Sequence, residues 1–344
     1  MRKKIAMKDI AKQLGVSTAL VSYVLNNKFL DRINPNTAKR IRELAEELQY
    51  QPNQIAKSLK ISRTLTIGLI IADISNLFYS SIARVIEDAA NKHRYKVIFG
   101  SADESLKKFE ELVQVFVNRQ VDGIILAAPE GAESTLAYLQ QQNIPFVLID
   151  RDFPQLNDLN SIIIDNCKAS YSVVEHLCHQ GFRHPAMVTL ASNLHHLKER
   201  SRGFSVACKE LLGIKKIRVV EMEENTLTDE MEEVVLQLVA DENIDSVYFS
   251  TNKIALDALV VLAKNKIKVP SSIGVICFDE AYAYNIFSTT ISYVKQPLGE
   301  IGHKAVEMLI SRIKGNQNAE RIILDTEIVE GNSTKRAATK IRVN

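Results

Sequence analysis

The chain from Thr66 to Asp279 alternates strand-sized apolar runs with amphipathic segments, and this alternation limits the possible fold more than any other feature. The apolar runs, such as TIGLIIA, DGIILAA and IGVICFD, are nearly continuous. Strands of this kind are buried on both faces, which is typical of parallel sheets covered by helices. The roughly 280 residues after position 63 are enough for two such lobes. We therefore expect an α/β core of two parallel-sheet lobes.

The first 50 residues follow a different pattern, that of three short helices near residues 7–14, 17–26 and 35–49. Gly15 suits a tight turn after the first helix, and Ser17 is a favourable N-cap for the second. An apolar set that includes Val21 places the second helix across the first. This arrangement is a helix-turn-helix signature, in which the second helix enters a DNA major groove.

The second helix has an uncharged face, although the solvent side of a helix normally carries Lys and Glu. Val21 and Val24 belong to its buried stripe. Hydroxyl groups can contact base edges or phosphates, and a methyl group can pack on thymine. We predict DNA contacts by the small or hydrogen-bonding residues of the face, which are Thr18, Ala19, Ser22, Tyr23 and Asn26.

The basic charge of the chain is concentrated at its N-terminus. Residues 1–63 hold 13 Lys and Arg against 5 Asp and Glu, a net charge of +8, so that the remainder of this +2 chain carries −6. A basic small domain next to an acidic large one is expected when only the small domain contacts phosphate.

Other features exclude several classes of protein. The apolar runs are shorter than the roughly 20 residues that span a bilayer, and no secretory signal is recognisable, so we expect a cytoplasmic protein. Four cysteines without CxxC spacing indicate free thiols. No phosphate-binding glycine motif and no nucleophile-elbow motif occurs, so we expect neither a cofactor nor catalysis. We expect no metal, because the nearby cysteines and histidines lack ligand spacing: Cys167, His176, Cys178, His179 and His184.

The sequence resembles the LacI/GalR family of bacterial transcription regulators. The resemblance is carried by KDIAKQLGVSTALVSYVLNN, YQPNQIAKSL, TIGLIIADISNLFYSSIARVIEDAA, RQVDGIILA, FVLIDRD, ERSRGF, VICFDE and VKQPLGEIGHKAVEMLI, in the family's order. It implies a helix-turn-helix domain (1–51), a hinge helix and linker (52–63) and an effector-binding and dimerisation core (64–344). The core lobes, similar to periplasmic sugar-binding proteins, would span about 64–180 with 296–325, and about 181–295 with 326–344.

The resemblance also implies site residues. In the hinge, Leu59 would insert between base steps of the minor groove, with Ala56 alongside and Asn53 near the backbone. Tyr23 stands where the family usually has Arg. In the cleft between the lobes, the effector would contact Phe78, Arg151, Arg200, Phe249, Asn252 and Asp279. Asp150 and Arg151 are the weaker candidates, since each could be a structural ion-pair partner.

We therefore expect a DNA-binding regulator, a repressor, which forms a homodimer, binds a pseudo-palindromic operator and responds to a sugar or sugar derivative. Two alternatives stay open. One is a regulator of the same fold that senses a partner protein or a nucleoside. The other is a sugar-binding protein without a DNA function.

Overall fold

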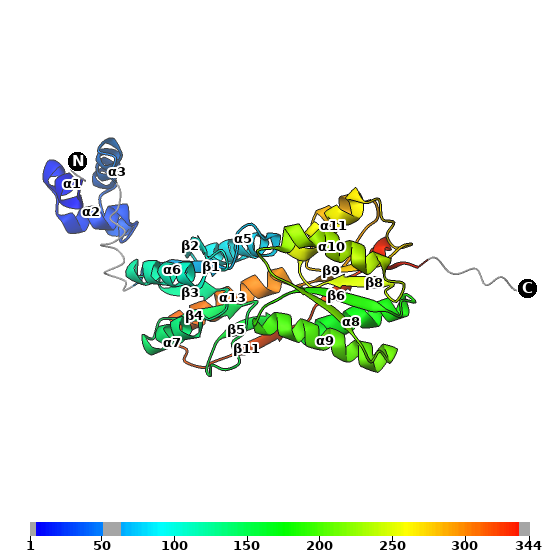
Figure 1. Cartoon of the computed structure of the whole chain (residues 1–344). Coiled ribbons are helices and arrows are strands. Elements are labelled where there is room, and N and C mark those ends of the chain that lie inside the picture. The colour runs from blue at the N-terminus through cyan, green and yellow to red at the C-terminus, as the bar shows by residue number, and fades with distance from the viewer. Residues whose placement is uncertain (1–4, 51–62, 337–344) are drawn as a thin grey trace, which may run out of the picture. The chain divides into compact units, whose positions relative to one another are not determined.

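The computed structural model describes residues 5–50 and 63–336, shown in colour in Figure 1. Two compact units make up the chain, divided between Thr64 and Leu65. We call residues 5–50 the headpiece and residues 65–336 the core. The predicted hinge residues Asn53, Ala56 and Leu59 lie outside the described residues.

The headpiece contains the three predicted helices, α1 (Met7–Leu14), α2 (Thr18–Leu25) and α3 (Pro35–Glu47), with a 3-10 turn, η1 (Leu30–Arg32), that the sequence did not suggest. Gly15 adopts φ +67° and ends α1, as predicted from its freedom in the left-handed region. The Ser17 hydroxyl accepts a hydrogen bond from the Leu20 N–H at 3.1 Å and caps α2. Local capping chemistry thus sets both sides of the turn.

A small apolar core holds the three helices of the headpiece together. Val21 and Val24 of α2 are completely buried, as are Ile10 of α1 and Ile41 of α3. The stripe predicted from the sequence therefore packs inward, and the opposite face of α2 is left for solvent or a partner.

Two six-stranded sheets form the core (Figure 1). The first has the order β11-β5-β4-β3-β1-β2 and is parallel throughout. The second has the order β12-β10-β9-β8-β6-β7, with β12 antiparallel to β10. The strands are β1 (Thr66–Ile71), β2 (Lys96–Ser101), β3 (Gly123–Leu126), β4 (Phe146–Ile149), β5 (Ser161–Ile164), β6 (Pro185–Leu190), β7 (Arg218–Met222), β8 (Ser246–Phe249), β9 (Gly274–Phe278), β10 (Ser292–Lys295), β11 (Arg321–Leu324) and β12 (Glu327–Val329).

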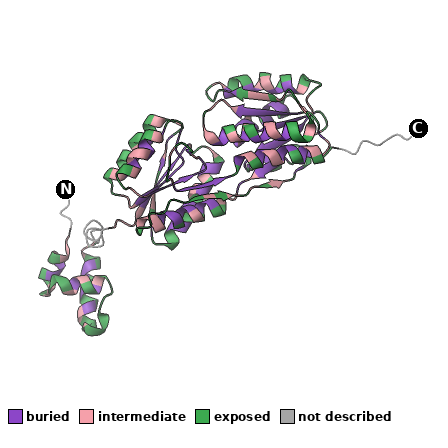
Figure 2. Ribbon diagram, turned by 90° about the horizontal axis from the view of Figure 1, so that it is seen from below, coloured by how far each residue is buried: buried purple, intermediate pink, exposed green. Residues whose placement is uncertain are grey.

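Helices connect the strands and cover the sheets, with their apolar sides buried and their outer sides exposed (Figure 2). The helices of the core are α5 (Leu77–Lys92), α6 (Leu106–Asn118), α7 (Glu133–Gln141), α8 (Asn166–His179), α9 (His195–Leu212), α10 (Leu227–Ala240), α11 (Asn252–Lys264), α12 (Ala283–Ile286) and α13 (Leu298–Ile313); a second 3-10 turn is η2 (Asn332–Thr334). Two mostly parallel sheets confirm the predicted fold class.

The chain passes between the two sheets three times, after β5, after β10 and after β11. We call the first sheet with its helices the first lobe, and the second sheet with its helices the second lobe. The predicted domain and lobe limits stay predictions. The sequence predicts that the chain stays in the first lobe until about residue 180. Because α8 packs against α9 and β12 of the second lobe, the contacts favour a passage of the chain into the second lobe before Asn166. Within the described ranges, no helix has the length and apolar content needed to cross a membrane.

Candidate nucleic-acid interface and ligand cleft

The five predicted DNA-contacting residues lie together on α2 or at its end. Thr18, Ala19, Tyr23 and Asn26 are exposed, and Ser22 is half-buried. Asn26 caps the helix by donating from Nδ2 to the Ser22 carbonyl at 2.8 Å. The face is therefore uncharged and accessible, as a surface that approaches base edges closely must be.

Tyr23 is held by a second aromatic residue that sequence reasoning did not identify. The Phe29 ring packs edge-on against Tyr23, with ring centroids 5.2 Å apart, and the Arg32 guanidinium lies 5.9 Å from the Phe29 centroid. Edge-to-face packing favours a fixed ring orientation. Tyr23 is thus oriented on the face rather than buried, and Phe29 positions it.

A cavity of about 280 Å³ lies between the two lobes of the core. Its walls are formed by segments that follow β1, β2, β3 and β4 of the first lobe and β6, β7, β8 and β9 of the second. These are the carboxyl ends of parallel strands, the edge where α/β sheets usually bind ligands. We call this cavity the cleft. It brings together five of the six predicted effector residues: Phe78, Arg151, Arg200, Asn252 and Asp279.

Phe249, the sixth predicted residue, does not line the cleft, and this prediction is corrected. Its side chain is fully buried in the core of the second lobe, with Val188 and Val247. All four residues of β8 are buried. A strand that is buried along its whole length does not reveal from its sequence which side chains lie on which face of the sheet. Tyr248 belongs to a different buried cluster, on the other side of the sheet.

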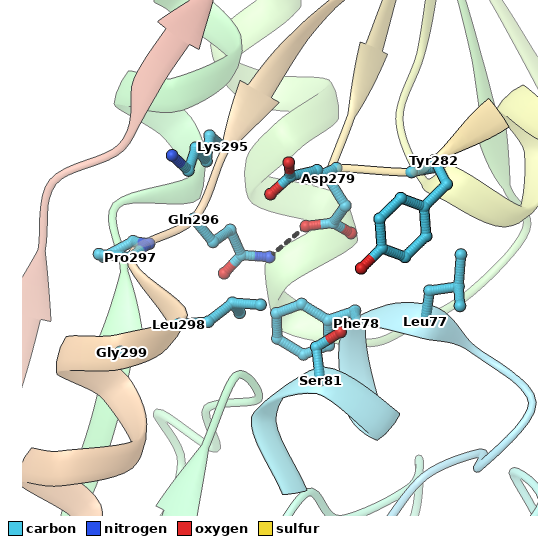
Figure 3. A pocket seen from close by; sticks show the side chains of 12 residues that line it. Leu77, Phe78, Ser81, Asp279, Tyr282, Lys295, Gln296, Pro297, Leu298 and Gly299 are labelled. Atoms are coloured by element: carbon cyan, nitrogen blue, oxygen red, sulfur yellow. Dashed lines mark hydrogen bonds between the residues drawn. The ribbon is translucent and has the colours of Figure 1, made fainter. Parts of the chain in front are cut away.

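Asp279 follows β9 in the left-handed backbone region, with φ +63°, and is only 8% exposed. One carboxylate oxygen accepts a hydrogen bond from Gln296 Nε2 at 2.7 Å, drawn as a dashed line in Figure 3. Burial raises the pKa of Asp279 to about 6, against the lowering effects of Arg200 and Gln296. Asp279 is therefore a buried acceptor that favours a donor from a ligand.

Asp279 and Phe78 also line a neighbouring cavity of about 320 Å³, which Figure 3 shows. Leu77, Phe78 and Ser81 come from α5, and Tyr282 and Gln296 belong to segments of the second lobe. The buried Gln296 Oε1 has no hydrogen-bond partner among the described residues. The two cavities share a wall, so Asp279 and Phe78 are accessible from both.

Arg200, on α9, is 2% exposed and is held on three sides. Its Nε donates to Asn166 Oδ1 at 2.8 Å, its Nη1 donates to the Ser250 carbonyl at 2.7 Å, and its guanidinium carbon lies 3.5 Å from the Phe278 ring centroid. Nη2 makes no hydrogen bond within the described residues and is left as a donor for a ligand. The planar group is thus preorganised for a hydroxyl.

Asn252 links the two lobes by donating from Nδ2 to Asn76 Oδ1 at 2.8 Å. Asn76 Oδ1 also accepts from the Phe78 N–H, so Asn76 presents its oxygen and Asn252 must present its amide nitrogen. Asn252 Oδ1 is consequently directed elsewhere; it is buried and has no partner among the described residues. A buried amide oxygen of this kind requires a donor.

Arg151 is 4% exposed and is engaged by protein groups. Its Nη1 and Nη2 donate to the two oxygens of Glu104 at 2.8 and 2.5 Å, its Nε donates to the Tyr79 hydroxyl at 3.1 Å, and Nη1 also reaches the Ala128 carbonyl at 3.2 Å. These contacts favour a structural role, the reading that the sequence left open.

Replacing Arg151 with lysine is expected to lower the free energy of unfolding by about 1–2 kcal/mol, because an ammonium cannot form the bidentate pair with Glu104. Effector affinity should change less than about threefold, because in this reading Arg151 does not contact the effector. Urea unfolding and ligand titration measure the two quantities. A large loss of affinity without a loss of stability would instead make Arg151 a ligand contact. Arg84→Lys, in an exposed i,i+3 pair, is the matched control.

The sequence analysis missed the cleft residues His196, Asn76 and Glu130, and also Gln296 of the neighbouring cavity. His196 lies four residues before Arg200 on α9, a spacing that could have indicated it. Burial keeps its pKa well below the usual value, so its imidazole is neutral. Asn76 is the N-cap of α5 in the segment after β1, Gln296 directly follows β10, and Glu130 lies in the segment after β3. The Glu130 carboxylate accepts from Asn193 across the cleft at 2.8 and 3.0 Å.

The cysteines and histidines around α8 lie in or next to that helix, and some of them contact other parts of the core. His176 Nε2 lies 2.8 Å from Thr334 Oγ1, and Cys167 and Cys178 are free thiols. No group of three or more metal-ligating side chains gathers within residues 5–50 and 63–336.

The chain is similar to known proteins over nearly its whole length. Residues 6–53 match the model of "Bacterial regulatory proteins, lacI family", and residues 174–334 match that of a periplasmic binding protein-like domain. The HTH-type transcriptional regulator RegA of Clostridium saccharobutylicum is 32% identical over 333 residues, which cover 96% of this chain and 99% of RegA.

Solved structures share the fold. The lac repressor dimer bound to operator and the anti-inducer ONPF has a TM-score of 0.83 at 20% identity, covering 96% of this chain and 99% of that one. The complex of the transcriptional regulator CelR with cellobiose has a TM-score of 0.69 at 20% identity, with 96% and 99% coverage.

Proposed function

The chain belongs to the lacI family of bacterial regulatory proteins and is a DNA-binding transcription regulator, and we propose that it is a repressor whose operator affinity is set by a sugar or sugar derivative in the cleft. The observation that carries the effector part is the meeting of Arg200, Asn252 and Asp279 around one cavity between the lobes.

The DNA-binding part of the proposal assigns base reading to the uncharged face of α2. Attraction to DNA would come from the exposed basic side chains of the headpiece, among them Lys8, Lys12, Lys28 and Arg42. Discrimination would come from Thr18 and its neighbours on the face, including the Tyr23 ring held by Phe29. Asn53, Ala56 and Leu59 keep their predicted roles at the minor groove.

The effector part rests on hydrogen-bond chemistry. A sugar hydroxyl can accept from Arg200 Nη2 and can donate to Asp279 or to Asn252 Oδ1. The Phe78 ring can cover an apolar C–H face. The bound cellobiose of the CelR complex supports the choice of a carbohydrate.

Regulation would act through the contacts that join the lobes across the cleft. The pairs Asn76–Asn252 and Glu130–Asn193 connect the two sides. A ligand that binds one arrangement of the lobes more tightly than the other would shift their equilibrium, and only such a difference in affinity can change operator binding. We further propose that the protein is a cytoplasmic homodimer that works by binding and not by catalysis.

Selection of operator sequences from random duplexes by the full-length protein is expected to return a pseudo-palindrome whose binding constant falls steeply with salt. Tyr23→Ala should weaken binding about tenfold or change the preferred half-site, since one base or phosphate contact is worth about 1–3 kcal/mol. Phe99→Ala, at an exposed site in the core, is the control. Failure to bind any duplex at low salt would contradict the proposal.

A further inference from the structure

Carboxylates outnumber cationic side chains on the walls of the cleft. Three cationic residues line it: Arg151, Arg200 and Lys253. Seven acidic residues line it: Asp73, Glu104, Glu130, Asp150, Glu223, Glu224 and Asp279. The cleft is therefore a region of negative potential, and partial desolvation between the lobes strengthens that potential.

The cationic groups of the cleft are already used by the protein. Arg151 forms its bidentate pair with Glu104, and Lys253 Nζ lies 2.5 Å from Glu224 Oε1. Arg200 is fixed by two hydrogen bonds and by the Phe278 ring, and the charge of the neighbouring Asp279 opposes its own. An anionic ligand would find one guanidinium nitrogen and no unopposed positive charge.

The acidic groups, in contrast, are only partly compensated. Asp279 is opposed by Arg200, but Asp73, Glu130 and Glu223 form no ion pair with any residue of the described ranges. Asn252 Oδ1 adds a buried acceptor without a donor, and its orientation is fixed by the contact with Asn76. The free hydrogen-bonding capacity of the cleft is thus mainly acceptor capacity, which hydroxyl or ammonium groups would satisfy.

We propose that the effector carries no negative charge: the cleft takes a neutral polyhydroxy molecule, favours an ammonium group in place of a hydroxyl, and rejects phosphorylated and carboxylated sugars. The inference rests on the proposed sugar-binding function and narrows its ligand class. A phosphate ester would bring about −1.5 to −2 charges next to three carboxylates that have no ion-pair partner among the described residues, Asp73, Glu130 and Glu223. Juxtaposed like charges are a strong means of excluding a wrong ligand.

The test is a titration of the full-length protein, by calorimetry and thermal shift, with matched sugars that differ in one group. Suitable sets are glucose, glucosamine and glucose 6-phosphate; galactose, galactosamine and galactose 6-phosphate; and ribose with ribose 5-phosphate. Within any set that binds, the phosphate ester should bind at least 100-fold more weakly than the neutral sugar. The amino sugar should bind at least as tightly as the neutral one.

A phosphate ester that binds as tightly as its neutral parent would overturn this inference and leave the proposed function intact. If no member of any charge class binds while the protein still binds operator DNA, both the sugar-binding function and the inference fail.

A variant that removes acidic charge from the cleft shows whether a phosphate ester is excluded by charge or by the size of the cavity. The double change Asp73→Asn with Glu223→Gln should reduce the preference for the neutral sugar over its phosphate at least tenfold, measured by competition. Glu175→Gln, at an exposed site on α8 outside the cleft, should leave that ratio unchanged. An unaltered ratio in the double variant would show that charge is not the cause.

Discussion

Replacing Asp279 with asparagine is expected to stabilise the unliganded core by about 1–3 kcal/mol at pH 7.5, because each pKa unit corresponds to about 1.4 kcal/mol. The same change should weaken effector binding by about 10- to 100-fold, since a hydrogen bond to a charged group contributes about 1.5–3 kcal/mol. The variant would be more stable and less responsive. Asparagine keeps the shape of the residue and can still accept from Gln296.

The stabilisation follows from the pKa of Asp279, which burial raises from 3.8 to about 6. The folded state therefore binds more protons than the unfolded state between about pH 4 and pH 6, and the free energy of unfolding falls as the pH rises through this window. Above pH 6 the buried negative charge exerts its full destabilising effect. The variant lacks this charge, so its stability should not decline over that range.

Urea unfolding of both proteins at pH 4.5 and pH 7.5 measures this difference. Asp325→Asn, at an exposed carboxylate on the surface, controls for the loss of any one negative charge. A sugar that binds the parent is then titrated into each variant. Equal affinity for parent and Asp279→Asn would remove Asp279 from the proposed binding site, and a variant less stable than the parent at pH 7.5 would contradict the assigned cause of the pKa shift.

Replacing Tyr282 and Ile286 together with serine is expected to convert the proposed homodimer into a monomer and to weaken operator binding by about 100-fold or more. Tyr282 directly precedes α12 and Ile286 is its last residue; their side chains are 86% and 85% exposed, the most exposed large apolar residues among the described ranges. Apolar side chains gathered at one place on a surface mark contact regions. A second copy of the chain is the occupant that the proposed function requires.

The size of the effect follows from the operator. In a dimer, two linked headpieces bind the two half-sites of one operator. Joining two binding modules in this way raises the overall affinity by roughly 10² to 10⁴. Light scattering gives the mass of each variant, and fluorescence anisotropy gives its operator affinity. Val115→Ser, at another exposed apolar residue, is the control. A double variant that remains dimeric would place the interface elsewhere.

The sequence predicts best where structure is decided locally. The end of α1 depends on Gly15, whose N–H bonds the Ala11 carbonyl four residues back. The start of α2 depends on Ser17, whose hydroxyl accepts from the Leu20 N–H three residues on. The strands β1 to β9 were recognisable because each is a short apolar run between helices. The strands β10, β11 and β12 follow Asp279 and were not predicted; the antiparallel β12 has only three residues.

Contacts between distant residues could not be predicted in the same way. Arg151 meets Glu104 and Tyr79, 47 and 72 positions away, and this pairing decides its role. Phe249 was placed wrongly because a strand buried on both faces does not show which side chains face a cleft. The aromatic pair of Tyr23 and Phe29 depends on the loop after α2, where Phe29 takes φ +52°.

The three passages of the chain between the sheets also limit how the lobes can move. Three covalent connections keep the lobes from separating, so that a change in the cleft takes place as a rotation of one lobe relative to the other. Within the described residues, opening the cleft at its far side has to break the contacts between Asn76 and Asn252 and between Glu130 and Asn193, whereas both sheets stay intact. Because these few hydrogen bonds contribute about 1–3 kcal/mol each, the binding energy of one small molecule is sufficient to determine the angle between the lobes.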